Sequence, residues 1–91
     1  MEYNFYTPND YAMKLANKIK RIRKRKKLTQ KNLAARSNVS YASYRKFEEK
    51  GEISLSSLIK IMMELGVIDD FNALFENPVY QSIEEVINDA K

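Results

Sequence analysis

The side chains that could do chemistry in this 91-residue chain are mostly cations. Residues 14–50 hold 14 basic residues against Glu48 and Glu49, a local charge of +12, whereas residues 51–91 hold two lysines against eight acidic residues. A positive block this dense favours a polyanionic partner. A solvated, lysine-rich helix face explains the charge equally well. A basic helix on a membrane surface is a weaker alternative, because the block lacks the Trp and Phe face of such helices.

The residues that most catalytic and metal sites need are missing. The chain has no Cys and no His, which excludes disulfides, the usual zinc sites and Ser-His or Cys-His catalysis. The neighbouring carboxylates Asp69–Asp70 and Glu84–Glu85 are better explained as charges that favour helix starts. We expect no enzyme activity, no metal and no cofactor. Because no apolar run approaches the ~20 residues of a membrane span, we also expect a cytoplasmic protein without a membrane partner.

Low Gly and Pro content and apolar spacings of three and four predict an all-α fold, a compact domain of five helices with a short C-terminal helical tail. We place an N-terminal arm at 1–6, the domain at 7–76 and the tail at 77–91. Thr7 caps the first helix, which has Pro8 at its first position and runs to about residue 26. Its expected buried stripe is Tyr11, Leu15, Ile19 and Ile22.

Polar caps and left-handed residues predict the later helices. Thr29 begins a helix over about 30–37, Asn38 supplies a tight turn, and Ser40 begins a helix over about 41–50 that Gly51 ends. The inward residues of this region are Leu33, Ala34, Val39, Tyr44 and Phe47. Ser54 caps a fourth helix that ends at Gly66, with Leu58, Ile61, Met62 and Leu65 as its core stripe. Asp69 opens a short fifth helix that carries Phe71, Leu74 and Phe75. A capping box over 82–85 starts the helix of the tail.

Two short helices around a three-residue turn follow the helix-turn-helix plan, in which the second helix can enter a DNA major groove. The outer face of the predicted second helix is small and basic, and it carries no carboxylate before Glu48. Its residues are Tyr41, Ala42, Ser43, Arg45 and Lys46. A DNA backbone can approach such a face closely.

The chain resembles the phage-repressor-type (XRE-like) helix-turn-helix regulators over about residues 12–76. The residues that carry the resemblance are Arg23, Leu28-Thr29-Gln30, Leu33-Ala34, Val39-Ser40, Glu48, Gly51, Ser54-Leu55, Leu58 and Leu65-Gly66. Asn38 replaces the turn glycine of the family, and Tyr44 replaces an aliphatic residue. The stretches 51–69 and 80–87 resemble more narrowly the HipB-type antitoxin regulators.

The resemblance implies roles for individual residues. Gln30 and Ser43 match phosphate contacts, and we also assign Lys27 and Lys31 to phosphates, although Lys27, like Lys20 and Lys24, contributes mainly to the general positive field. The positions that face base edges are Ser40, Tyr41, Ala42 and Lys46, to which we add Arg45. Gln30 and Tyr41 are alternatively plain surface residues. Arg23 matches a residue that pairs with the counterpart of Glu48, and we favour this ion pair over a DNA contact for Arg23.

The acidic C-terminal part carries more apolar residues than five small helices can hide. We expect part of this surface to form a homodimer or partner contact through Phe71, Leu74, Phe75, Val79, Tyr80, Ile83, Val86 and Ile87. The alternative is that the tail folds back over its own domain.

The implied function is sequence-specific binding of a palindromic double-stranded DNA operator by a homodimer, with transcriptional repression as the outcome. The competing function is an antitoxin that restrains a HipA-like kinase toxin and regulates its own operon. RNA binding is a further alternative, because charge alone does not distinguish RNA from DNA.

Overall fold

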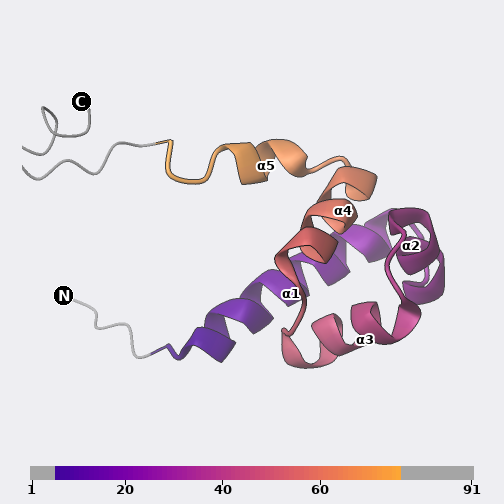
Figure 1. Cartoon of the computed structure of the whole chain (residues 1–91), viewed down its shortest axis with the longest axis horizontal. Coiled ribbons are helices and arrows are strands. Elements are labelled where there is room, and N and C mark those ends of the chain that lie inside the picture. The colour runs from indigo at the N-terminus through magenta and orange to yellow at the C-terminus, as the bar shows by residue number, and fades with distance from the viewer. Residues whose placement is uncertain (1–5, 77–91) are drawn as a thin grey trace, which may run out of the picture.

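Side-chain caps set the start of the first four helices in the computed structural model of this chain, which describes residues 6–76. The hydroxyl oxygens of Thr7, Thr29, Ser40 and Ser54 each accept a hydrogen bond from the backbone N–H three residues later, at 3.0–3.2 Å. The helices are α1 (Pro8–Arg25), α2 (Gln30–Ser37), α3 (Tyr41–Lys50), α4 (Leu55–Leu65) and α5 (Ile68–Asn72) (Figure 1). No strand occurs within residues 6–76, so the predicted all-α fold is confirmed.

Left-handed residues end three of these helices where the sequence predicts. Asn38 closes α2 with φ 57° and ψ 43°, and Gly51 and Gly66 close α3 and α4. Each is a residue type that tolerates this conformation. Residues 1–5 of the predicted arm at 1–6, the tail at 77–91 and the capping box at 82–85 lie outside the described residues.

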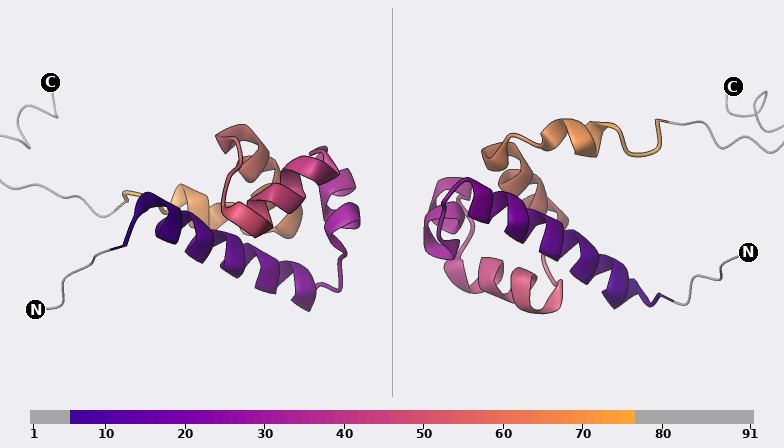
Figure 2. Two further views of the ribbon diagram at one scale, coloured as in Figure 1. Left: turned by 90° about the horizontal axis from the view of Figure 1, so that it is seen from below. Right: turned by 180° about the vertical axis from the view of Figure 1, so that it is seen from behind.

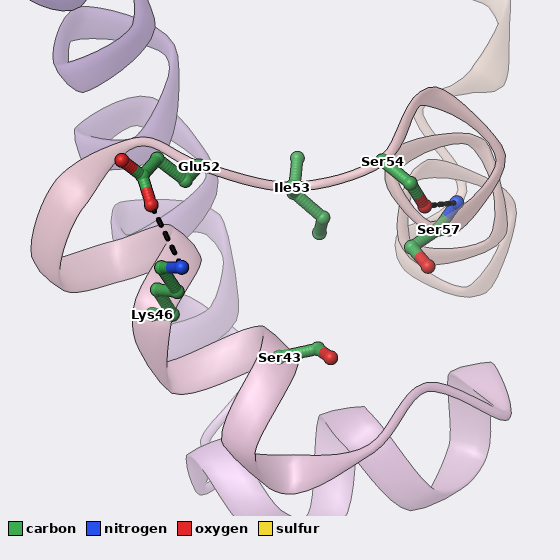
Figure 3. A pocket seen from close by; sticks show the side chains of 6 residues that line it. All are labelled: Ser43, Lys46, Glu52, Ile53, Ser54 and Ser57. Atoms are coloured by element: carbon green, nitrogen blue, oxygen red, sulfur yellow. Dashed lines mark hydrogen bonds and ion pairs between the residues drawn. The ribbon is translucent and has the colours of Figure 1, made fainter.

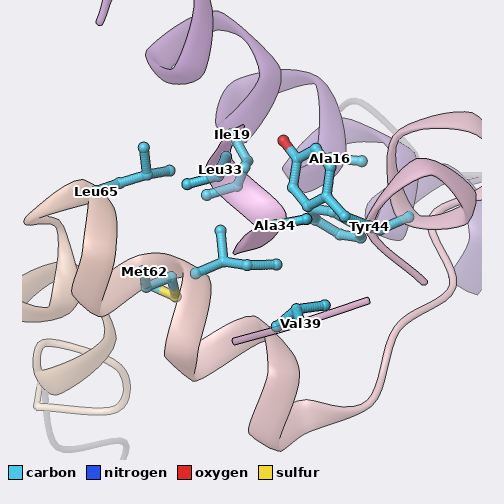
Figure 4. Packing of buried hydrophobic residues seen from close by; sticks show 10 residues of the cluster. Ala16, Ile19, Leu33, Ala34, Val39, Tyr44, Met62 and Leu65 are labelled. Carbon is cyan, nitrogen blue, oxygen red and sulfur yellow. The ribbon is translucent and has the colours of Figure 1, made fainter. Parts of the chain in front are cut away.

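The core lies between α1 and the three helices that follow it. α3 packs along α1, α2 packs against α3 and α4, and α5 packs against α4. The views in Figure 2 place α2, α3 and α4 on one side of the long α1. The buried apolar side chains, most of which Figure 4 labels, are Ala16, Ile19, Leu33, Ala34, Val39, Tyr44, Phe47, Ile61, Met62 and Leu65. The inward residues predicted for α2 and α3 are all among them, and Leu58 of the predicted α4 stripe is half-buried.

The buried stripe predicted for α1 is wrong for two of its four residues. Tyr11 is 48% exposed and Leu15 is 37% exposed, while Ile22 is half-buried and only Ile19 is buried. The buried residues of α1 are instead Ala16, Ile19 and Arg23. The physical reason is a close approach of the end of α3, where a Cβ on Gly51 would lie only 2.9 Å from the Cβ of Ala12. A small residue must therefore stand at position 12, where α1 meets the end of α3.

The short fifth helix begins and ends earlier than expected. After Gly66 the amide of Val67 bonds to the carbonyl of Met62, and α5 starts at Ile68 without a side-chain cap, rather than at Asp69. Phe71 is half-buried against the core, but Leu74 and Phe75 follow the helix and are 56% and 94% exposed. None of the described helices combines the length and the apolar character that crossing a membrane requires.

Candidate nucleic-acid interface

Hydrogen bonds at the turn hold α3 at a fixed angle to α2. The amide of Val39 donates to the carbonyl of Ala34 at 2.9 Å, and Ala34 itself is buried where the two helices cross. The hydroxyl of Ser40 accepts from the amide of Ser43 and donates to the Ser43 hydroxyl at 2.7 Å. Because a hydroxyl has one proton and two acceptor sites, Ser43 keeps its own proton for an outside acceptor. Ser40 is thus used for capping, whereas Ser43 is available to a phosphate.

The outer surface of α3 carries the predicted base-facing side chains. Tyr41, Ala42, Arg45 and Lys46 are all exposed, as is Ser43. Two cations lie over the ring of Tyr41: the Lys31 Nζ is 5.4 Å from the ring centroid and the Arg45 guanidinium carbon is 5.6 Å from it. These cation–π contacts hold a cation of α2 and a cation of α3 at the start of the second helix of the motif.

Lys46 is not a free cation in the structure. Its ammonium lies 2.9 Å from a carboxylate oxygen of Glu52, and both side chains are more than half exposed. The hydrogen bond and charge of Lys46 lower the pKa of Glu52 below its ordinary value. An exposed pair of this kind contributes little to stability and opens easily, so Lys46 can exchange the carboxylate for a phosphate or a base edge.

A shallow hollow of about 300 Å³ borders this surface between α3 and the start of α4 (Figure 3). Its lining consists of Ser43, Lys46, Glu52, Ile53, Ser54 and Ser57. Figure 3 shows the Lys46–Glu52 pair on the α3 side and the capped first turn of α4 on the other. The interface is therefore concave next to the outer face of α3, with Ile53 as the one apolar residue among the six that line the hollow.

A buried polar cluster anchors α3 from the inside. Arg23 of α1 donates to Glu48 of α3 through Nε at 2.7 Å and through Nη2 at 3.0 Å, so the implied ion pair is present. Arg23 also donates to the carbonyl of Leu28 at 2.8 Å, which ties the α1–α2 connection to the same group. Gln30 Nε2 donates to Glu48 at 2.9 Å, and the Tyr44 hydroxyl donates to the other Glu48 oxygen.

These contacts shift three pKa values in directions that keep Arg23 and Glu48 ionised and Tyr44 neutral. Burial disfavours the Glu48 carboxylate, but the hydrogen bonds from Arg23, Tyr44 and Gln30 outweigh burial and lower its pKa. The hydrogen bond to Glu48 raises the pKa of Arg23. Burial, reinforced by the bond to Glu48, raises the pKa of Tyr44 well above its ordinary value. The ionised pair persists throughout the neutral range.

The structure therefore gives Gln30 a role that the sequence analysis missed. Its amide nitrogen is used inside the protein, and only its remaining amide proton and its oxygen are left for a phosphate contact. The Tyr44–Glu48 bond was also missed, although a spacing of four residues on a helix makes such a pair possible. No local signal links Gln30 to Glu48 or Lys46 to Glu52.

The other predicted contact residues lie at separate places. Lys31 is exposed on α2, and Lys27 is exposed with a left-handed backbone, φ 58°, in the connection before it. Phe71 packs against the core, while Leu74 and Phe75 form an exposed apolar pair beyond α5. Val79, Tyr80, Ile83, Val86 and Ile87 lie outside the described residues. No group of three or more acidic residues that could hold a metal ion occurs within residues 6–76.

The chain thus has two short helices joined by a three-residue turn. A buried polar cluster lies behind the second helix, and a surface of small and basic residues lies in front of it. These features define a DNA-binding helix-turn-helix domain. A helix-turn-helix family model, of the XRE type, matches residues 19–68, more than half of the chain. The chain therefore belongs to the XRE family of helix-turn-helix proteins and is a DNA-binding regulator of that type. No curated protein gave a significant match.

Proposed function

We propose that this protein is a sequence-specific transcriptional repressor that binds a palindromic operator as a homodimer, with α3 in the major groove. The observation that carries the proposal is the outer surface of α3, where exposed Arg45 and Lys46 flank the small Ala42 and no carboxylate precedes Glu48 on the helix. Arg and Lys can bond guanine O6 and N7, and an alanine methyl can contact a thymine methyl. Occupation of an operator by such a domain blocks access of other proteins to it.

We assign base contacts to Tyr41, Ala42, Arg45 and Lys46, and to Ser40 through the one acceptor site that capping leaves on its hydroxyl. We assign phosphate contacts to Lys27, Gln30, Lys31 and Ser43. The free hydroxyl proton of Ser43 and the exposed ammonium of Lys31 support the phosphate assignment. Tyr41 contributes through its edge and hydroxyl, because two cations already lie over its ring. Each phosphate that is neutralised should steepen the salt dependence of binding by a log–log slope of about 0.9.

The homodimer is supported by the apolar pair Leu74 and Phe75. Both side chains are largely exposed beyond α5, which lies on the side of the molecule opposite α3 in Figure 1. A contact there leaves α3 free for DNA. A two-fold dimer reads two half-sites about 34 Å apart, one turn of the duplex.

The test is selection of the operator from random duplex DNA at two salt concentrations, followed by binding measurements on variants. Replacement of both Arg45 and Lys46 by Ala should abolish operator binding while the helical circular dichroism stays unchanged. Lys60→Ala removes an exposed cation of α4 and serves as the control for general charge loss, with an expected effect of less than about threefold. Unchanged affinity of the Arg45/Lys46 variant would show that the assigned face is wrong.

A second candidate is an antitoxin that restrains a HipA-like kinase and represses its own operon. The same exposed Leu74 and Phe75 favour it, because they lie beyond the residues matched to the DNA-binding family and are not needed for DNA contact. A kinase-like reading frame next to the gene and co-purification of its product would support this candidate. Loss of co-purification on deletion of residues 78–91 would locate the contact in the tail.

A further inference from the structure

A line of four cations runs along the side of α1 that is turned away from the core. Lys14, Lys18, Arg21 and Arg25 follow one another at helical spacings of four, three and four residues, and all four are exposed. The buried residues Ala16, Ile19 and Arg23 lie on the opposite side of the same helix. We call these four cations the outer ridge of α1. None of them forms an ion pair within residues 6–76.

Binding of DNA through α3 leaves the outer ridge unexplained. α3 packs against the inner side of α1, so the ridge and the outer surface of α3 face away from each other. In the right-hand view of Figure 2, α1 lies in front of the other helices and no described helix covers it. A duplex seated on α3 therefore contacts none of these four side chains, which act on it only through their long-range field.

Apolar side chains accompany the ridge. Leu15 and Ile22 lie seven residues apart beside it, and Tyr11 precedes Leu15 by one turn and is about half exposed. Ile22 lines a shallow hollow of about 280 Å³ together with Lys18, Arg21 and Arg25. A strip of cations beside aliphatic groups suits an acidic amphipathic peptide better than a bare phosphate backbone, which offers nothing to the aliphatic side chains.

The chain itself contains a segment of this chemistry. Residues 82–91 carry Glu84, Glu85 and Asp89, and their apolar residues Ile83, Val86, Ile87 and Ala90 recur at the spacing of one helix face. We propose that residues 82–91 of a second copy of this chain dock on the outer ridge of α1. The carboxylates meet the ridge cations, and the apolar residues cover Leu15 and Ile22.

A second copy fits this role better than the same chain. The described part ends after α5, which packs against α4, and the five residues 77–81 span at most about 17 Å. To reach the outer side of α1, the tail of the same chain must follow about half the circumference of a helix about 10 Å wide, roughly 16 Å, which uses nearly all of that length. A second copy can instead lie with its own tail beside the ridge, and reciprocal exchange closes a two-fold dimer. The inference rests on the proposed homodimer but not on the DNA contacts.

The test is a charge-swap series in the full chain, followed by sedimentation equilibrium. Lys18→Glu with Arg21→Glu should weaken self-association about tenfold, and Glu84→Lys with Glu85→Lys should do the same. Combining all four changes should restore the dissociation constant to within about threefold. Lys60→Glu on α4 is the control and should leave the constant unchanged.

Each other outcome overturns the inference in a distinguishable way. If the unmodified chain dimerises and neither reversal weakens it, the docking surface is wrong and the homodimer stands. If the unmodified chain is a monomer at every concentration, both proposals fail. If the ridge reversal abolishes operator binding without changing self-association, the ridge is a second DNA surface.

Cysteine pairing separates a second copy from the same chain, because the native chain has no cysteine. A mixture of Leu15→Cys and Ile87→Cys chains should form a disulfide-linked dimer on oxidation, whereas Ile87→Cys mixed with Lys60→Cys should not. In the chain carrying both Leu15→Cys and Ile87→Cys, a link within one chain at all dilutions would place the tail on its own domain and refute the exchange.

Discussion

Replacing Glu48 with Gln tests whether the buried cluster holds α3 in place. The Glu48 carboxylate accepts two hydrogen bonds from Arg23, at 2.7 and 3.0 Å, one from Gln30 at 2.9 Å and one from the Tyr44 hydroxyl. The amide keeps the shape of the side chain but removes its charge and turns one acceptor into a donor. Arg23, which is only 8% exposed, then lies in the core without a counter-charge.

The expected loss is about 3–5 kcal/mol of the free energy of unfolding, the usual result of breaking a buried ion pair from one side. A domain of this size has a total of about 5–15 kcal/mol. A loss of about 3 kcal/mol lowers the melting temperature by at least about 12 °C. The variant should therefore be partly unfolded at 37 °C, and operator binding should decline in parallel with helicity.

Urea and thermal denaturation followed by circular dichroism measure this loss. Glu52→Gln is the matched control, because it removes the same charge from an exposed ion pair, and its denaturation midpoint should not move. The double variant Arg23→Met with Glu48→Leu should be more stable than Glu48→Gln alone, since it leaves no unpaired charge in the core. A loss below about 1 kcal/mol for Glu48→Gln would refute the reasoning, because the pair would then behave like a surface pair.

Four further predictions follow from single residues. Because the pKa of Glu48 is lowered in the folded state from an ordinary 4.5, its contribution to stability is complete above about pH 5 and is lost as the pH falls through the folded value. The raised pKa of Tyr44 has the opposite effect on stability, which is lost as the pH rises above the ordinary value of 10.0. Tyr44→Phe should remove much of this loss, as measured by denaturation midpoints from pH 9 to about 11. The hydroxyl of Ser37 is buried without a hydrogen-bond partner within residues 6–76, so Ser37→Ala should stabilise the domain by about 1 kcal/mol, and a lower urea midpoint would contradict this. Asn38 has φ 57°, so Asn38→Ala should cost about 1–2 kcal/mol while Asn38→Gly costs nothing, and equal midpoints for the two variants would exclude a left-handed turn in solution.

Local chemistry explains why most of the helix boundaries were predictable. A threonine or serine followed by a free backbone N–H three residues later needs no distant partner to begin a helix, and Asn38, Gly51 and Gly66 end theirs through their own φ preference. The helix-turn-helix motif was predictable for the same reason. α5 was predicted less well, because Val67 offers no side-chain cap and the start of that helix depends on how the chain leaves Gly66.

The candidate interface was predicted in its composition but not in its pairing. The outward position of Arg45 and Lys46 follows from the inward position of Tyr44 and Phe47 on the same helix. The partners of these cations, Tyr41 and Glu52, could not be ranked from the sequence, since many exposed groups lie within reach of a long side chain. The bond of Gln30 to Glu48 could not be predicted from the sequence, because it joins residues of two different helices.

The sequence by itself determined the five helices, the turn at Asn38 and the basic character of residues 14–50, because caps, φ preferences and charges act over a few residues. Only the tertiary structure decided which side of α1 is buried. Hydrophobicity favours Tyr11 and Leu15, yet the close approach of Gly51 to Ala12 and the ion pair with Glu48 bury Ala16 and Arg23 instead. Side-chain size and a distant counter-charge thus outweigh the local hydrophobic pattern in setting the orientation of α1. In this orientation the outer ridge of α1 points away from α3, so the positive charge is divided between two surfaces.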